Sequence, residues 1–214
     1  MPGYTLYGSQ GSGSSTVELA LERIGLPYRS VRASTWESDS AQAELRSVNP
    51  LGQIPTLVFP DGSVMTESAA ILIHLGLSHP EAALLPTEAS ARAQAIRGLV
   101  FVAANCYSNV SISDYPERWI SECTEDDPLR ERVRLGARAQ LHRSWEIFAD
   151  SFEAQPFFGG QAPGALDYLA AVVSKWSGTR AHIKKHRPQF LETVLRIEQH
   201  PHVAPVFARH WPAT

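Results

Sequence analysis

The ten residues from Asn49 to Val58, Asn-Pro-Leu-Gly-Gln-Ile-Pro-Thr-Leu-Val, constrain the fold of this chain more than any other stretch. Asn-Pro followed by Gly52 predicts a turn, because proline fixes φ and glycine accepts backbone angles that other residues avoid. The residues from Ile54 onward predict a short strand with Pro55 at its start, where a missing ladder donor is tolerated. The Ile54–Pro55 bond is of a kind that adopts the cis form at modest cost. In that form the Ile54 amide and carbonyl face outward, free to pair with an extended peptide. An ordinary turn followed by a strand explains the same residues.

The chain around this segment is long enough for two small domains or one large one. Its 43% apolar residues indicate a globular protein, and the net charge of -3 gives no electrostatic reason to expect nucleic-acid binding. It has no apolar run of about 18 residues and no signal-peptide pattern, so we expect a cytoplasmic protein without a membrane segment. Two cysteines, Cys106 and Cys123, are too few for a disulfide framework, and the scattered histidines lack metal-ligand spacing.

The first third of the chain alternates strand and helix patterns. Strands are predicted at residues 5–7, 28–33, 54–58 and 64–65, with a hairpin turn at 60–63, and helices at 16–24, 41–48 and from 66 onward. From about Ala82 strand patterns largely disappear, and helical patterns cover 89–107, 129–152, 166–176 and 188–199. We therefore predict an α/β domain over 1–79 with a small mixed sheet, a linker over 80–86 and an all-helical domain over 87–214.

Two motifs in this order resemble the cytosolic glutathione S-transferase superfamily. They are the segment 49–57 and the helix start Thr-Glu-Ser-Ala-Ala-Ile at 66–71; Gly159-Gly160 and Gly-Ala-Leu-Asp at 164–167 form a weaker third match. The resemblance implies a thioredoxin-like domain with a mixed four-stranded sheet, followed by a helical bundle. Within the superfamily, the chain resembles bacterial-type members with a serine-rich catalytic loop, without a match to one particular class. It also implies a role in detoxification and a two-fold homodimer.

Glu67 and Ser68 stand where a helix begins. The free N–H groups and positive dipole end of a helix favour an anion, the Ser68 hydroxyl adds a donor, and Glu67 can pair with an ammonium group. This pair suits an amino-acid head such as the γ-glutamyl end of glutathione, although a simple helix cap explains it too. By resemblance, Ile54 before Pro55 pairs its backbone with the cysteinyl part, and Gln53 is the candidate for the glycyl end.

The loop over residues 8–15 is where the resemblance places the group that activates the thiol. A serine hydroxyl at a helix start can donate to a thiolate and lower the thiol pKa. The loop lacks the cysteine that some classes carry there, and Ser12 lies nearest the expected position, with Ser14 and Ser9 behind it. A cap or a solvated hydroxyl explains each serine as well. The loop fits neither a P-loop nor a dinucleotide fingerprint.

An acceptor pocket is expected between the two domains, lined from the first long helix of the second. Its candidates are Asn105, Cys106, Tyr107, Tyr115 and Trp119, although residues of these types more often simply pack. Cys106 is better interpreted as a small apolar core residue. Tyr7, in the first strand, is expected to pack rather than to activate the thiol. Gly164 stands where the family places a serine or threonine cap, and Asp167 can still reach back to a backbone N–H.

The resemblance implies a transferase that adds the glutathione thiolate to a hydrophobic electrophilic small molecule, with glutathione as co-substrate and no metal. A glutathione-dependent peroxidase, reductase or isomerase is an alternative within the same fold. Exchange through an enzyme cysteine is disfavoured, because the loop has none. A non-catalytic relative that binds a protein partner is an alternative from another class.

Overall fold

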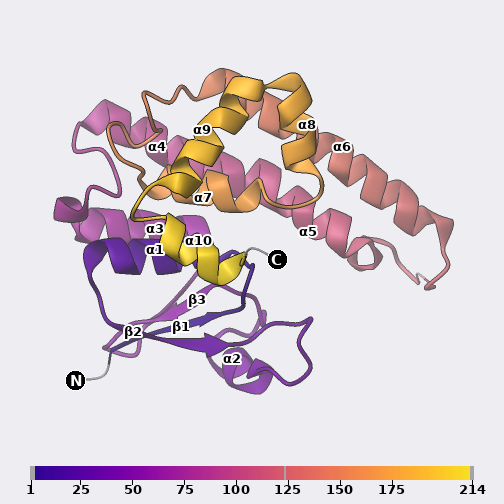
Figure 1. Cartoon of the computed structure of the whole chain (residues 1–214). Coiled ribbons are helices and arrows are strands. Elements are labelled where there is room, and N and C mark those ends of the chain that lie inside the picture. Colours follow the sequence, from indigo (N-terminus) through magenta and orange to yellow (C-terminus); the bar gives the residue numbers. More distant parts are fainter. Residues whose placement is uncertain (1–2, 123, 213–214) are drawn as a thin grey trace.

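The computed structural model describes residues 3–122 and 124–212, and Figure 1 shows a small sheet covered by a larger group of helices. Cys123, one of the two cysteines, lies outside the described residues. No helix in the described part of the chain combines the length and apolar character that crossing a bilayer requires. The domain limits at 79 and 87 stay a prediction.

The sheet has four strands in the order β2-β1-β3-β4. They are β1 (Tyr4–Gly8), β2 (Tyr28–Arg32), β3 (Thr56–Val58) and β4 (Val64–Thr66). β1 runs parallel to β2 and antiparallel to β3, with Leu6 opposite Leu57, and β3 pairs antiparallel with β4 across the hairpin. This mixed sheet, followed by helices, confirms the predicted fold class.

Three helices belong to this first part: α1 (Ser14–Ile24), α2 (Gln42–Val48) and α3 (Ser68–Ser78). In Figure 1, α1 and α3 cover one face of the sheet and α2 lies on the other. Because side chains alternate along a strand, Leu6 joins the core that α1 and α3 share, whereas Tyr7 packs with Leu45 of α2. Tyr7 is a packed strand residue, as the sequence predicts, and its hydroxyl donates to Glu44 at 2.8 Å.

The second part of the chain is helical. Its α-helices are α4 (Ala89–Phe101), α5 (Ser108–Asp114), α6 (Pro128–Ser151), α7 (Ala165–Val173), α8 (Thr179–His186), α9 (Pro188–Gln199) and α10 (Ala204–His210). Short 3₁₀ turns η1 (Pro80–Ala82) and η3 (Pro116–Trp119) connect them. Every residue of α7 is buried, and one apolar core joins it to the helices over the sheet.

The long helix predicted over residues 89–107 does not end at 107. It continues as α5 to Asp114, and the π-helical segment η2 (Val102–Tyr107) interrupts its regular α geometry. A π segment is rare, and it changes which face of the helix the following side chains occupy. The prediction also missed α8, in which Ile183 is the buried apolar residue, and the short α10.

Asp167 at the start of α7 is fully buried, and its carboxylate accepts from the backbone N–H groups of Phe158, Gly159 and Gly164 at 2.8–2.9 Å. The predicted bond back to the helix start is therefore confirmed. Gly164 has a packing reason: a Cβ there would lie 2.7 Å from the carbonyl oxygen of Leu84. That carbonyl accepts from the Ala165 N–H at 2.8 Å, so the segment before α4 lies directly against the start of α7.

Candidate active site

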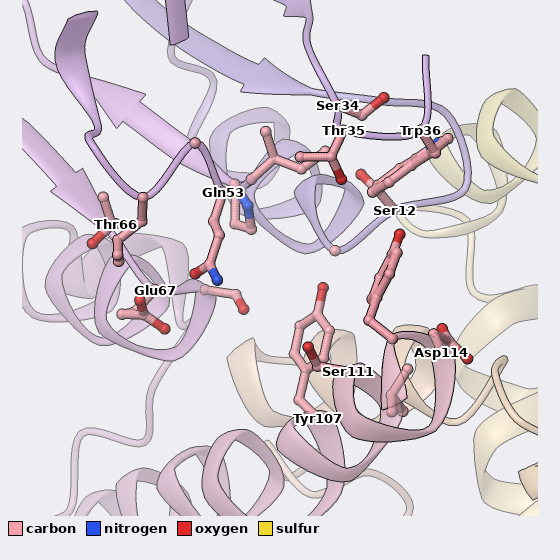
Figure 2. A pocket seen from close by; sticks show the side chains of 18 of the residues that line it. Ser12, Ser34, Thr35, Trp36, Gln53, Thr66, Glu67, Tyr107, Ser111 and Asp114 are labelled. Carbon is pink, nitrogen blue, oxygen red and sulfur yellow. The ribbon is translucent and has the colours of Figure 1, made fainter. Parts of the chain in front are cut away.

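A cavity of about 780 Å³ lies between the sheet and the helical part, and both parts line it (Figure 2). Most of the residues that the sequence nominated meet there: Ser12, Gln53, Ile54, Pro55, Glu67, Ser68, Tyr107, Tyr115 and Trp119. Ser9, Ser14, Asn105 and Cys106 are not part of its lining. The nominated residues that meet in the cavity are thus up to about a hundred positions apart in the chain, from Ser12 to Trp119.

Glu67 and Ser68 occupy the start of α3 at one side of the cavity. Glu67 has φ 65°, in the left-handed region that a residue with a side chain rarely adopts. Its carboxylate makes no hydrogen bond to the first N–H groups of α3, so it does not cap the helix. Glu67 is exposed to the cavity, whereas Ser68 is buried beneath it. Backbone strain of this kind clusters at functional sites, which favours a binding role over a capping one.

The segment before β3 presents its backbone to the cavity. The Ile54–Pro55 peptide bond is cis, and within the described residues the backbone amide and carbonyl of Ile54 make no hydrogen bond. Asn49 holds the turn from behind, since its side-chain amide donates to the Gln53 carbonyl and to Thr56 Oγ1, both at 3.0 Å. The Gln53 side chain points into the cavity toward Glu67 in Figure 2. Ile54 therefore offers an unpaired donor and acceptor in a fixed turn.

The loop between β1 and α1, residues 9–13 (the serine loop), places Ser12 at the cavity. Ser12 Oγ donates to the Ser9 carbonyl at 2.7 Å and lies 2.8 Å from Ser14 Oγ. The Ser9 hydroxyl is turned away and donates to Glu37 at 2.7 Å. Of the three candidate serines, Ser12 is thus the one that faces the cavity, and Ser9 and Ser14 support it from within the protein.

Tyr107 reaches the same point from the helical part. A Cβ added to Gly13, the residue before α1, would lie 2.2 Å from the Tyr107 hydroxyl oxygen, so this contact requires glycine. Burial raises the pKa of Tyr107, and the negative charge of Glu67 raises it further, so the phenol keeps its proton at neutral pH. The ring packs on Trp176 with centroids 5.3 Å apart. A protonated hydroxyl therefore stands at the start of α1, beside Ser12.

The cavity opens toward aromatic side chains. Trp119 and Trp36 are 62% and 55% exposed, and the Arg118 guanidinium lies 3.9 Å from the centroid of the Tyr115 ring. The sequence reasoning missed several lining residues, namely Ser34, Thr35, Trp36, Arg46, Thr66, Ser111, Asp114, Arg118 and Trp176. Trp36 lies in a loop, where no helical or strand periodicity could identify it as a lining residue. The presence of a tryptophan in such a loop was the one local signal available.

Two predicted acceptor residues lie elsewhere. Cys106 is fully buried in the core, where desolvation raises the pKa of its thiol, in agreement with the small-core-residue interpretation. Asn105 is exposed, and its amide donates back to the Phe101 carbonyl at 3.2 Å. Because successive residues of a helix project in different directions, Tyr107 faces the cavity while its neighbours Asn105 and Cys106 do not.

Comparison with known proteins agrees with this architecture. A family model described as the N-terminal domain of glutathione S-transferase matches residues 13–77. The GST-like protein YncG of Escherichia coli K12 is 32% identical over 174 residues, 80% of each chain. A probable maleylacetoacetate isomerase of Caenorhabditis elegans is 36% identical over 92 residues, 43% of this chain and 41% of that one. A glutathione transferase homologue from Sulfitobacter, solved with bound glutathione, superposes with a TM-score of 0.83 at 22% identity, covering 96% and 97% of the two chains.

Fold and site together define a thioredoxin-like domain that shares a cavity with a helical bundle. Because the YncG match extends over 80% of both chains, the chain belongs to the cytosolic glutathione S-transferase superfamily. This confirms the resemblance drawn from its sequence.

Proposed function

We propose that the cavity binds glutathione and that the protein transfers its thiolate to an electrophilic small molecule. One observation carries the proposal: the unpaired backbone of Ile54, the uncapped start of α3 and the Ser12 hydroxyl all line one cavity. A γ-glutamyl tripeptide needs partners of these three kinds, for its extended backbone, its amino-acid head and its thiol. The bound glutathione in the Sulfitobacter structure supports the same assignment.

Each end of glutathione has a partner. The head carboxylate sits at Ser68 and the α3 N–H groups, where the helix dipole favours an anion, and its ammonium pairs with Glu67. The cysteinyl amide and carbonyl pair with Ile54, as one strand pairs with another. The glycyl end lies at Gln53, and Arg46 near Gly52 adds a positive charge at that end of the cavity.

Thiol activation falls to Ser12. A hydroxyl donor and the positive end of α1, which spans 11 residues, both stabilise a thiolate and so lower the thiol pKa. Without glutathione, the Ser12 hydroxyl donates to the Ser9 carbonyl. When Ser12 turns toward the sulfur, Ser14 can donate to that carbonyl instead, because Ser14 Oγ lies 3.3 Å from the Ser9 carbonyl oxygen. Tyr107 stays protonated and is a second donor at this end of the cavity.

An isomerase is the second candidate, favoured by the match to the probable maleylacetoacetate isomerase. In that reaction the thiolate would add to a conjugated cis double bond, a single bond would rotate, and the same C–S bond would break to release the trans product. Glutathione would then be regenerated rather than consumed. The early steps are shared with conjugation, so the same binding residues serve both reactions.

Calorimetric titration with glutathione, followed by thiolate absorbance near 240 nm, tests the proposal. We expect binding and a thiolate signal at neutral pH, with Glu67→Gln weakening affinity and Glu192→Gln on α9 leaving it unchanged. With an activated chloroarene the free-thiol count should fall by one per product, whereas in isomerisation it stays constant. Absence of binding at millimolar glutathione would overturn the proposal and favour a protein-binding relative.

A further inference from the structure

The last described helix, α10, lies against the serine loop. In Figure 1 it sits beside α1, close to the sheet. Two hydrogen bonds connect it to the loop: the Gln10 side-chain amide donates to the Arg209 carbonyl at 2.8 Å, and the Gly11 N–H donates to His210 Nδ1 at 3.1 Å. The loop that carries Ser12 is therefore held by residues at the opposite end of the chain.

His210 is held in a defined state by a second partner. Its ring is buried, and Nε2 lies 2.9 Å from Glu18 Oε2 on α1. The tautomer that satisfies both contacts accepts from the Gly11 N–H at Nδ1 and donates from Nε2–H to the Glu18 carboxylate. Arg209 donates to the other Glu18 oxygen and to Glu22, which fixes the carboxylate in turn. The imidazole can neither flip nor turn without losing one of its two bonds.

Gly11 passes this restraint to Ser12. Its φ of 68° lies in the left-handed region, which directs its N–H toward α10. A Cβ at Gly11 would be 3.6 Å from both the His210 carbonyl oxygen and Trp211 Nε1, so the loop runs close against α10. The next residue is Ser12, whose hydroxyl faces the cavity. One peptide unit thus separates the His210 bond from the hydroxyl proposed to meet the thiol.

We propose that His210 is a positioning residue: through Gly11 it fixes the serine loop so that Ser12 stands at the thiol position. Its catalytic consequence rests on the proposed function. Without the Nδ1 acceptor the Gly11 N–H loses its partner and the turn gains freedom, which displaces a hydroxyl that must be placed to within a fraction of an ångström. Glu18 acts one step further back by holding the imidazole tautomer.

Two substitutions separate the two bonds of the ring. His210→Asn keeps an acceptor near the Nδ1 position but gives up the Glu18 bond, whereas His210→Gln keeps a donor near Nε2 and leaves Gly11 unpaired. We expect His210→Gln to lower kcat about three- to tenfold, the loss that one hydrogen bond represents, with the KM for glutathione within about twofold. His210→Asn should stay within about twofold of wild type in both, as should His202→Gln, an exposed ring that stacks on His200.

Hydrogen exchange of the Gly11 amide in the ligand-free protein tests the positioning without any reaction. We expect it to be about three- to tenfold faster in His210→Gln than in wild type, and close to wild type in His210→Asn, while the amide of Leu72 in the core is unchanged in both. Equal effects of the two substitutions on Gly11, or none, would overturn the inference. A protein that fails to bind glutathione but shows this exchange pattern refutes the proposed function and keeps the contact.

Discussion

Gly164→Ser should destabilise the protein, although it restores the side-chain cap that the family places there. As a helix cap the serine oxygen would gain only about 0.3 kcal/mol over glycine, and losing glycine's freedom in the unfolded chain adds about 0.4–1 kcal/mol. Against this, the new Cβ would lie 2.7 Å from the Leu84 carbonyl oxygen, a backbone atom that cannot rotate away. Overpacking costs about 1–3 kcal/mol, and the Ala165 bond to that carbonyl, if broken, leaves a buried N–H that costs about 1–3 kcal/mol.

The net expectation is a loss of about 1–3 kcal/mol, which for a chain of this length lowers Tm by roughly 2–12 °C. Thermal and urea unfolding of Gly164→Ser and Gly164→Ala should both show lower stability, with alanine the worse of the two because it carries the Cβ without the capping oxygen. Gly136→Ala is the matched control, since that helical glycine has open space around it and should gain about 1 kcal/mol. A Gly164→Ser protein as stable as wild type would refute the packing argument.

Three further predictions concern the site and its support. Ser12→Ala should lower turnover and the thiolate absorbance about ten- to hundredfold at nearly constant glutathione affinity, and Ser14→Ala should do so less; a larger effect at Ser14 would move the assignment. Gly13→Ala should cost about 1–3 kcal/mol in urea unfolding, and less in a Tyr107→Phe background, where the clashing hydroxyl is gone; strict additivity would contradict the contact. Burial raises the pKa of Glu18, but the bonds from His210 and Arg209 outweigh burial and hold that pKa below the usual 4.5. The ionised Glu18 therefore stabilises the fold above pH 4.5, and this stabilisation is lost as the pH falls further. Glu18→Gln should therefore flatten the fall of Tm with acid, and parallel curves would show that Glu18 contributes nothing there.

Local chemistry made part of this site predictable from sequence. The turn before Pro55 and the pair Glu67-Ser68 depend on a few adjacent residues, whose types already limit the backbone or supply the charge. Both features line the same cavity, as the sequence predicts. Their binding roles stay predictions. The sheet followed from the same kind of signal, because strand periodicity and hairpin turns are written in neighbouring residues.

What could not be predicted depends on contacts between distant segments. Position before the helix ranked Ser12 first among the serines, but the bonds that arrange them, from the Ser9 hydroxyl to Glu37 and from Ser12 Oγ to the Ser9 carbonyl, are not encoded in the loop. The π segment at residues 102–107 leaves no pattern of its own in the apolar residues. In the sequence Gly164 is a cap position without a side-chain acceptor, and only the fold brings the Leu84 carbonyl against it.

The bond between Gly11 and His210 also has a consequence for biosynthesis. Its two partners are 199 residues apart, so a ribosome adding about 5–20 residues per second makes them about 10–40 s apart. During that interval the sheet and α1 can form, but the serine loop lacks its last partner. Nascent chains arrested before residue 209 would then carry the residues proposed to hold glutathione, together with a serine loop that lacks its bonds to α10. The finished site appears only when synthesis reaches the end of α10.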